Sequence, residues 1–222
     1  MQNRTHDAKI ASLCPNSKFF FRFSGFFVNL LKYNLNLMER IKIHDKTFRP
    51  YIPGAEVEAD IARVAERLNA DYKDSAEVPL LLCVLNGAIM FTSELMKRLT
   101  FPCELVAVKL SSYEGVKSTG EVRTLMDITH SVAGRRVIIV EDIVDTGTTV
   151  IALQKLLAEK GAKDSVVCTM LFKEAAFRRA HGSAMETPRY IARNIDDKFI
   201  LGYGLDYDEL GRNLPDIWIL DE

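Results

Sequence analysis

Residues 137–149 read Val137-Ile138-Ile139-Val140-Glu141-Asp142-Ile143-Val144-Asp145-Thr146-Gly147-Thr148-Thr149, and this stretch decides the fold. Its first four residues are apolar and β-branched, which predicts a buried strand. In this interpretation two adjacent carboxylates end the strand, and a third precedes a Thr-Gly-Thr-Thr turn that opens an amphipathic helix over residues 150–160. Unpaired N–H groups and the positive end of that helix would converge at the turn, which therefore predicts a phosphate-binding loop.

The three carboxylates of this stretch need a separate explanation, because they would repel a phosphate. Glu141, Asp142 and Asp145 make chemical sense if they hold ribose hydroxyls, a divalent cation or a proton. The competing interpretation is an ordinary strand-to-helix turn with solvated acids. We favour a ligand site, because a buried strand, carboxylates, hydroxylated residues and a glycine rarely combine in this order by chance.

The rest of the chain alternates predicted helices and strands. Apolar residues at helical spacing predict helices over residues 55–72 and 89–99. Continuous apolar runs predict strands over residues 79–85, 105–110, 136–140 and 165–172, with shorter strands over 199–205 and 216–220. This alternation is typical of an α/β fold with a mainly parallel sheet.

Polar or glycine-containing segments follow the predicted strands. They are Asn86-Gly87, the run from Ser111 to Gly120, the acidic stretch from Glu141, and Lys173. Because ligands of open parallel sheets bind beyond the carboxyl ends of the strands, these segments predict one site. Taken singly, each has a plainer interpretation: Gly87 as a simple turn, the run from Ser111 as a solvated hairpin loop, and Lys173 as a surface lysine.

Composition and charge exclude several classes of protein. The 222 residues carry a net charge of −1, which gives no electrostatic reason to expect nucleic acid or an anionic membrane as the main partner. No Cys-x-x-Cys pair occurs, so a zinc site is not expected, and the four cysteines are interpreted as reduced thiols of a cytoplasmic protein. The phosphate-loop motif of nucleotide triphosphatases and the dinucleotide-binding motif are both missing from the sequence.

Residues 1–37 differ in character from the rest of the sequence. They contain clusters of phenylalanine, but Arg22 and Asn29 interrupt the apolar stretch, which is too short for a membrane-spanning helix. We expect an extension that is disordered or precedes the true start at Met38, and that is dispensable. A targeting segment is the alternative.

The quoted stretch resembles the phosphoribosyl-pyrophosphate signature of the type I phosphoribosyltransferases. The similarity runs from about Met38 to the C-terminus, and it is most specific to the hypoxanthine and hypoxanthine-guanine phosphoribosyltransferases. The resemblance implies an open, mainly parallel twisted sheet flanked by helices, with a small hood formed by terminal segments, as a single domain over residues 38–222. It implies purine salvage: transfer of the 5-phosphoribosyl group to hypoxanthine, and to guanine, with release of pyrophosphate.

The resemblance also assigns roles to residues of this sequence. Asp145 corresponds to a general base placed against N7 as the purine attacks C1 of the sugar, and Lys173 to the donor to the purine 6-oxo group. Phe199 corresponds to the aromatic that stacks on the base, with Ile200 and Leu205 at the base edge. The residues implied for phosphoribosyl pyrophosphate are Asn86, Gly87, Ser112, Tyr113, Glu141, Asp142, Asp145, Thr146, Gly147, Thr148, Thr149 and Arg212. Ser112 and Tyr113 belong to the family's closing loop, and the leading peptide at Asn86 can be cis.

Magnesium is the cofactor that the resemblance implies. Glu141 and Asp142 engage the ribose hydroxyls directly or through Mg²⁺, and Asp206 corresponds to a ligand of a second Mg²⁺. The implied partners are small-molecule substrates and further copies of the chain in a dimer or tetramer, in the cytoplasm. Residues 180–187 vary the family's loop length, which leaves its nearby arginine contact unassigned, with Arg178 as the nearest match.

Two other functions remain open from the sequence. The first is a regulatory protein of this fold that binds RNA or a nucleotide with little activity; a basic face would favour it. The second is an enzyme selective for xanthine or adenine. The pair Lys173 and Phe199 favours 6-oxopurines, because an ammonium group can donate to an oxygen but cannot accept from an exocyclic amine.

Overall fold

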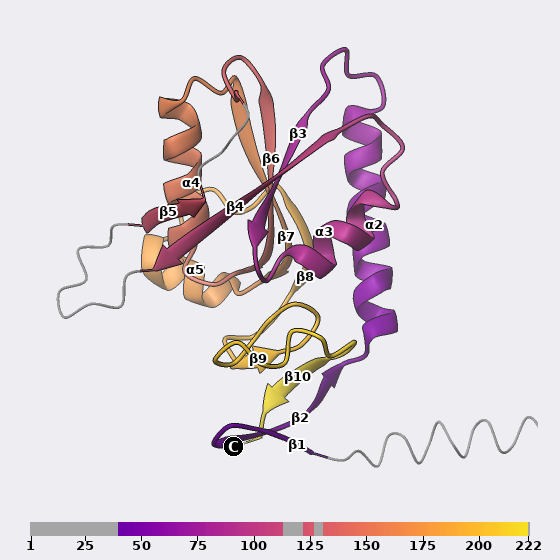
Figure 1. Cartoon of the computed structure of the whole chain (residues 1–222), viewed down its shortest axis with the longest axis vertical. Helices are drawn as coiled ribbons and strands as arrows, with labels where there is room; N and C mark the ends of the chain where they lie inside the picture. The colour runs from indigo at the N-terminus through magenta and orange to yellow at the C-terminus, as the bar shows by residue number, and fades with distance from the viewer. Residues whose placement is uncertain (1–39, 113–121, 127–130, 222) are drawn as a thin grey trace, which may run out of the picture. The chain divides into compact units, whose positions relative to one another are not determined.

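The computed structural model describes residues 40–112, 122–126 and 131–221, with only the backbone for residues 111, 112 and 122–126. A six-stranded sheet in the order β5-β4-β3-β6-β7-β8 forms its centre (Figure 1). The strands are β3 (Leu80–Leu85), β4 (Glu104–Ser112), β5 (Val122–Met126), β6 (Arg136–Val144), β7 (Asp164–Phe172) and β8 (Tyr190–Asn194). Neighbouring strands run parallel, except that β5 is antiparallel to β4.

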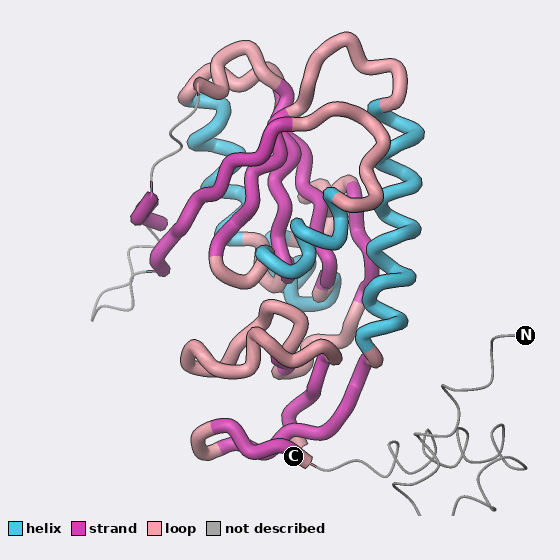
Figure 2. The backbone as a smooth tube through the Cα atoms, turned by 45° about the vertical axis from the view of Figure 1, so that its right-hand side comes forward, coloured by secondary structure: helices cyan, strands magenta, loops and turns pink. Residues whose placement is uncertain are grey.

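Helices cover both faces of this sheet, as Figures 1 and 2 show. On one face lie α2 (Gly54–Tyr72) and α3 (Ile89–Met96), and on the other lie α4 (Thr148–Glu159) and α5 (Glu174–His181). Two apolar clusters fill the space between the layers. One includes Leu68, Phe91 and Ile138, and the other includes Leu153 and Ile139. The sheet is buried on both sides because its central strands are almost wholly apolar.

A second, antiparallel sheet forms the hood, in the order β1-β2-β10-β9. It comprises β1 (Ile41–Ile43), β2 (Lys46–Ile52), β9 (Ile200–Leu201) and β10 (Ile217–Leu220), so it joins the first described residues to the last. In Figure 1 the hood lies beyond the carboxyl ends of the parallel strands. The α/β fold, the mainly parallel sheet and the hood of terminal segments are therefore confirmed.

The boundaries of several elements differ from the sequence-based prediction. Strand β6 does not end at Glu141 and Asp142 but continues to Val144, because its pairing with β7 continues to Phe172. Helix α3 ends at Met96 rather than Leu99, because the Arg98 N–H turns back to the Leu95 carbonyl in a tighter, three-residue turn. Helix α5 and strand β8 were not predicted. The predicted lid residues 113–120 and the extension 1–37 lie outside the described residues.

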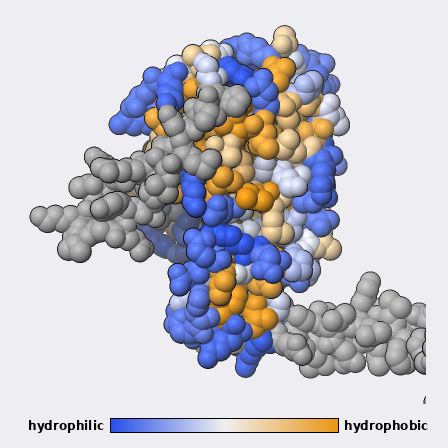
Figure 3. Space-filling model, in the orientation of Figure 1, coloured by the Kyte–Doolittle hydropathy of each residue, from blue (hydrophilic) through white to orange (hydrophobic). Residues whose placement is uncertain are grey.

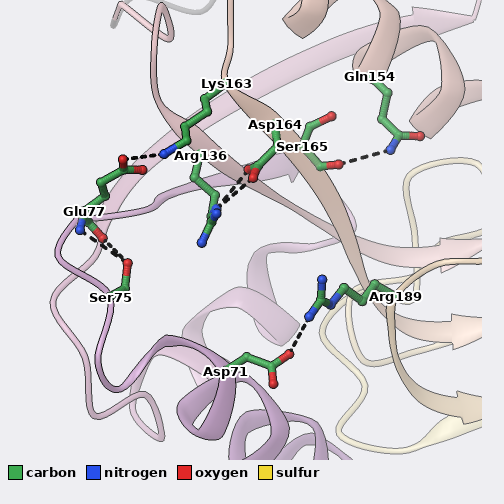
Figure 4. A network of polar contacts seen from close by, with 9 residues as sticks. All are labelled: Asp71, Ser75, Glu77, Arg136, Gln154, Lys163, Asp164, Ser165 and Arg189. Atoms are coloured by element: carbon green, nitrogen blue, oxygen red, sulfur yellow. Dashed lines mark hydrogen bonds and ion pairs between the residues drawn. The ribbon is translucent and has the colours of Figure 1, made fainter.

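The amino-terminal edge of the parallel strands is held by ion pairs between distant segments (Figure 4). Arg136 meets Asp164 at 2.9 Å, across the starts of β6 and β7. The other pairs are Lys163 with Glu77 at 2.5 Å and Arg189 with Asp71 at 2.9 Å. Each of these three basic side chains is thus paired with an acid. Within the described ranges, none of the helices combines the length and apolar character needed to cross a bilayer.

Candidate active site

The carboxyl-terminal edge of the parallel strands differs from the opposite edge because it carries polar groups that are only partly satisfied. The strands β3, β6 and β7 deliver Asn86-Gly87, the acidic stretch and Lys173 to this edge, as predicted. Figure 3 shows hydrophilic residues gathered in a band between the main body and the hood.

The predicted phosphate-binding loop forms a sharp turn into α4. Gly147 caps the helix with a φ of 80°, a conformation that side chains rarely adopt, and a Cβ there would lie 2.5 Å from the ring of Phe177. No acceptor among the described residues takes the N–H of Thr146 or Gly147. The hydroxyls of Thr146 and Thr148 lie 3.0 Å apart at the same turn. The loop therefore presents free donors at a helix N-terminus, which suits an anion.

The acidic pair of β6 is largely shielded from water. Glu141 is buried, and its Oε2 has no hydrogen-bond partner among the described residues. Burial, with the neighbouring charge of Asp142 as a smaller cause, raises the pKa of Glu141 well above its usual value. Burial likewise raises the pKa of Asp142 to about 6, although the Ile143 N–H donates to this carboxylate at 2.8 Å. Buried carboxylates with unused oxygens are suited to a ligand that brings hydroxyls or positive charge.

The tip of β3 lies directly against this acidic pair. The peptide between Leu85 and Asn86 is cis, as the resemblance allowed. A Cβ on Gly87 would lie 1.7 Å from Asp142 Oδ2, so no residue with a side chain fits there without displacing the carboxylate. The glycine is required by close approach rather than by a simple turn.

Lys173 reaches the acidic stretch from the end of β7. The residue is only 7% exposed, and its ammonium lies 2.8 Å from Asp145 Oδ2 and 3.5 Å from Asp197 Oδ1. The Lys173 N–H also donates to the Val144 carbonyl, which fixes the strand tip beside the loop. The proposed general base and the proposed base-recognition group are thus neighbours. A surface lysine would be extended into solvent.

The hood carries a cluster of aromatic side chains around Phe199. Phe199 is 42% exposed, and its ring packs against Phe48 at 6.0 Å and edge-on against Tyr207 at 5.5 Å between centroids. Its neighbour Ile200 and Leu205 are buried. By residue type alone Phe199 could equally be a core aromatic, but a core aromatic would be buried, so the exposed ring fits the stacking role better.

The loop after β9 carries the remaining predicted residues. Arg212 pairs with Asp206 at 2.9 Å and with Glu209 at 3.2 Å, and it donates to the Gly204 carbonyl at 3.0 Å. Its Nε is buried without a partner among the described residues. Arg212 thus sets the shape of the loop and keeps one donor unused.

The described residues hold no group of three or more His, Cys, Asp or Glu side chains that could bind a metal by themselves. Glu141, Asp142 and Asp206 therefore do not form one preformed cluster. This arrangement is compatible with Mg²⁺, which usually binds one or two carboxylates together with substrate oxygens and water. Ser112 ends β4 at the same edge, and Tyr113 lies outside the described residues.

Some contacts at the site were not predicted. Asp197 was not assigned a role, yet it meets both Lys173 and Arg179. The signal was available, because a carboxylate precedes the aromatic segment by two residues. Arg178, the nearest match to the family's arginine, instead donates to the carbonyls of Ser183 at 3.1 Å and Met185 at 2.6 Å. It is committed to the loop that follows α5.

Comparison with known proteins gives consistent results. Residues 53–208 match the family described as phosphoribosyl transferase domain. The chain is 34% identical over 180 residues to hypoxanthine phosphoribosyltransferase of Salmonella typhimurium, covering 79% of this chain and 98% of the relative. It is 38% identical over 170 residues to hypoxanthine-guanine phosphoribosyltransferase of Staphylococcus epidermidis, covering 73% and 90%.

Solved structures show the same similarity. A crystal structure of a hypoxanthine phosphoribosyltransferase from Staphylococcus aureus superposes with a TM-score of 0.70 at 32% identity, covering 78% of this chain and 91% of that one. The Trypanosoma cruzi hypoxanthine phosphoribosyltransferase in complex with the product IMP superposes with a TM-score of 0.70 at 32% identity, covering 82% and 97%.

Proposed function

Because this chain belongs to the hypoxanthine phosphoribosyltransferases of the type I phosphoribosyltransferase family, we propose that it transfers the 5-phosphoribosyl group of phosphoribosyl pyrophosphate to hypoxanthine and to guanine. The reaction serves purine salvage. A bond forms between N9 of the purine and C1′ of the sugar, the bond from C1′ to pyrophosphate breaks, and the purine loses the proton on N7.

One observation carries the proposal: the Lys173 ammonium lies 2.8 Å from the Asp145 carboxylate, at the start of a loop with free N–H donors. A 6-oxopurine presents an acceptor oxygen and the N7 proton on one edge of its rings. A cation and a carboxylate held side by side match those two groups. The adjacent loop accounts for the 5′-phosphate.

The residues then divide the chemistry among them. Asp145 takes the proton from N7 while N9 attacks, and Lys173 donates to the 6-oxo group. Phe199 stacks on the purine, and Ile200 and Leu205 border its edge. Residues 145–149 hold the 5′-phosphate. Catalysis in this arrangement is mainly positioning and charge stabilisation.

The acidic pair and the neighbouring strand ends are proposed to bind the ribose and pyrophosphate groups of phosphoribosyl pyrophosphate. Glu141 and Asp142 hold the ribose hydroxyls, a role supported by the unpartnered, buried Glu141 Oε2. Asn86 and Gly87 supply backbone groups to the pyrophosphate, and Arg212 has a spare Nε donor for it. Ser112 and Tyr113 are the proposed start of the closing loop that excludes water.

Magnesium fits the donor set of this site. Glu141 and Asp142 would hold one ion and Asp206 another, with the substrate's own oxygens completing the ligands. When bound there, Mg²⁺ would supply positive charge to balance the charge of the leaving pyrophosphate. The unused carboxylate oxygen of Glu141 is the observation that favours this fit.

We further propose that the enzyme acts in the cytoplasm as a homo-oligomer, a dimer or a tetramer. The cysteines Cys83, Cys103 and Cys168 are free thiols, which suits a reducing compartment. Size-exclusion chromatography with light scattering measures the oligomer, and a monomer at micromolar concentration would contradict it.

The test of function is a pyrophosphate-release assay with hypoxanthine, guanine, xanthine and adenine, combined with chromatography of the nucleotide product. We expect IMP and GMP with Mg²⁺, and adenine to be a poor substrate. The Asp145→Asn variant serves as the inactive control. A wild-type protein that binds phosphoribosyl pyrophosphate but converts none of the four bases would overturn the proposal in favour of a regulatory protein.

A further inference from the structure

Helix α5 contacts the phosphate-binding loop at three points of one face. Lys173, Phe177 and His181 follow one another at intervals of four residues, so their side chains project from the same side of the helix. Lys173, at its N-cap, meets Asp145. The ring of Phe177 lies 2.5 Å from the position that a Cβ on Gly147 would take. At the last helical residue, His181 Nε2 donates to the Thr146 carbonyl at 2.6 Å.

The contact made by His181 joins residues 35 positions apart and fixes one peptide of the loop. The carbonyl of Thr146 and the N–H of Gly147 belong to the same planar trans peptide, so they point in opposite directions. Because the Thr146 carbonyl points toward His181 at the end of α5, the Gly147 N–H points away from α5. There it has no acceptor among the described residues and is available to a ligand.

The histidine is exposed, and its ring has one aromatic neighbour in the same helix. Its ring lies 5.2 Å from the ring of Phe177, in a tilted arrangement, and Phe177 in turn fills the space under Gly147. The loop that continues from α5 is fastened by Arg178 to the carbonyls of Ser183 and Met185. The end of α5 is thus a supported element rather than a free helix terminus.

We propose that His181 is a positioning residue for the 5′-phosphate site. Its N–H holds the Thr146 peptide so that the Gly147 N–H stays aimed at the phosphate before substrate arrives. The inference rests on the proposed function, because the ligand of the loop is taken to be the 5′-phosphate of phosphoribosyl pyrophosphate and of IMP. His181 should therefore affect only ligands that carry this phosphate. It is not proposed to contact the purine or pyrophosphate.

The experiment compares three substitutions that separate the ring from its donor. His181→Phe keeps a ring against Phe177 but removes the N–H. His181→Gln keeps a donor at nearly the same distance from the backbone but removes the ring, and His181→Ala removes both. The matched control is Arg67→Met, which removes an exposed side-chain donor to the Arg189 carbonyl, 2.9 Å away at the opposite edge of the sheet.

We expect His181→Phe to raise the KM for phosphoribosyl pyrophosphate about three- to tenfold, the range for loss of one ordinary hydrogen bond. The KM for IMP in the reverse reaction should rise by the same factor, because both ligands carry the 5′-phosphate. The KM values for hypoxanthine and pyrophosphate, and the thermal midpoint, should stay near those of wild type. His181→Gln should recover most of the loss, His181→Ala should not, and Arg67→Met should behave as wild type.

Other results would overturn the inference. If His181→Phe raises all four KM values and lowers the thermal midpoint, the residue only supports the fold. If it changes none of them, the contact has no role in the site. Calorimetric binding of phosphoribosyl pyrophosphate to wild type and His181→Phe gives an answer independent of turnover. Failure of the proposed function gives a different result. The wild-type protein would then make no IMP, yet its binding of phosphoribosyl pyrophosphate would still weaken in His181→Phe. That outcome would refute the proposed function and support the positioning role.

Discussion

Replacing Lys173 with methionine tests whether this lysine selects the purine. Methionine keeps most of the buried volume of the side chain and removes only the ammonium group. The partners left behind, Asp145 and Asp197, are 45% and 40% exposed, so water can solvate both carboxylates. The substitution should therefore have little effect on the free energy of unfolding, and its main consequence should appear in the kinetics.

The magnitude follows from the burial of the lysine. At 7% exposure, water cannot easily take the place of the ammonium beside a bound purine. A hydrogen bond from a charged donor contributes about 1.5–3 kcal/mol, which corresponds to a factor of about 10 to 150. We expect kcat/KM for hypoxanthine and guanine to fall by that factor, while the KM for phosphoribosyl pyrophosphate changes by no more than about threefold.

Steady-state assays with each base at saturating phosphoribosyl pyrophosphate, and with the latter varied at saturating hypoxanthine, separate the two effects. Lys163→Met is the matched control, because Lys163 also pairs with a carboxylate, Glu77 at 2.5 Å, but at the opposite edge of the sheet. Adenine should remain a poor substrate, since removing a donor does not create an acceptor. A raised KM for phosphoribosyl pyrophosphate with unchanged purine kinetics would show that Lys173 binds phosphate, and the base-recognition argument would be wrong.

Four further outcomes follow from the site. Asp145→Asn should lower kcat by about 10²–10⁴-fold with little change in the KM for phosphoribosyl pyrophosphate, and steady-state activity within a few-fold of wild type would contradict the general-base role. Gly87→Ala should destabilise the protein by about 1–3 kcal/mol and impair turnover, because its Cβ would lie 1.7 Å from the Asp142 carboxylate; an unchanged urea midpoint would contradict this. The pKa of Asp142 is raised from 3.8 to about 6, so the stability linked to this group is present below pH 3.8 and is lost as the pH rises through 6. The unfolding free energy of wild type should therefore fall by about 2 kcal/mol relative to Asp142→Asn between pH 4 and 8, and parallel pH profiles from urea titrations would refute it. A chain that begins at Met38 should fold and form IMP, because every proposed site residue lies beyond that point; loss of its cooperative melting or of its activity would show that residues 1–37 are needed.

The sequence alone was sufficient for the α/β architecture and for placing several candidate residues at one edge of the sheet. Helical and strand periodicities are local properties, so residues 55–72 and 165–172 were recognised without knowledge of their neighbours. The direction of a parallel strand also follows from the alternation with helices. Asn86-Gly87, the acidic stretch and Lys173 could therefore be placed on one edge in advance.

The tertiary structure decided the features that depend on pairing between distant segments. The hood pairs β2 with β10, and the four residues of β10 are too few for a periodicity that specifies a partner. The same holds for β6, whose last residues stay extended because β7 lies beside them. Local sequence patterns at Glu141 and Asp142 suggested an earlier end.

The same distinction applies within the site. Sequence identified Lys173 and Asp145 as separate candidates, but only the fold brings the ammonium to 2.8 Å from the carboxylate and Gly87 against Asp142. His181 had no recognisable pattern, since its role comes from a single hydrogen bond to a peptide 35 residues away. Functional residues that directly follow a strand can be located from the sequence, because the end of the strand fixes where they lie in the sheet. Contacts between distant segments cannot be predicted in this way, because they depend on how separate elements pack against one another.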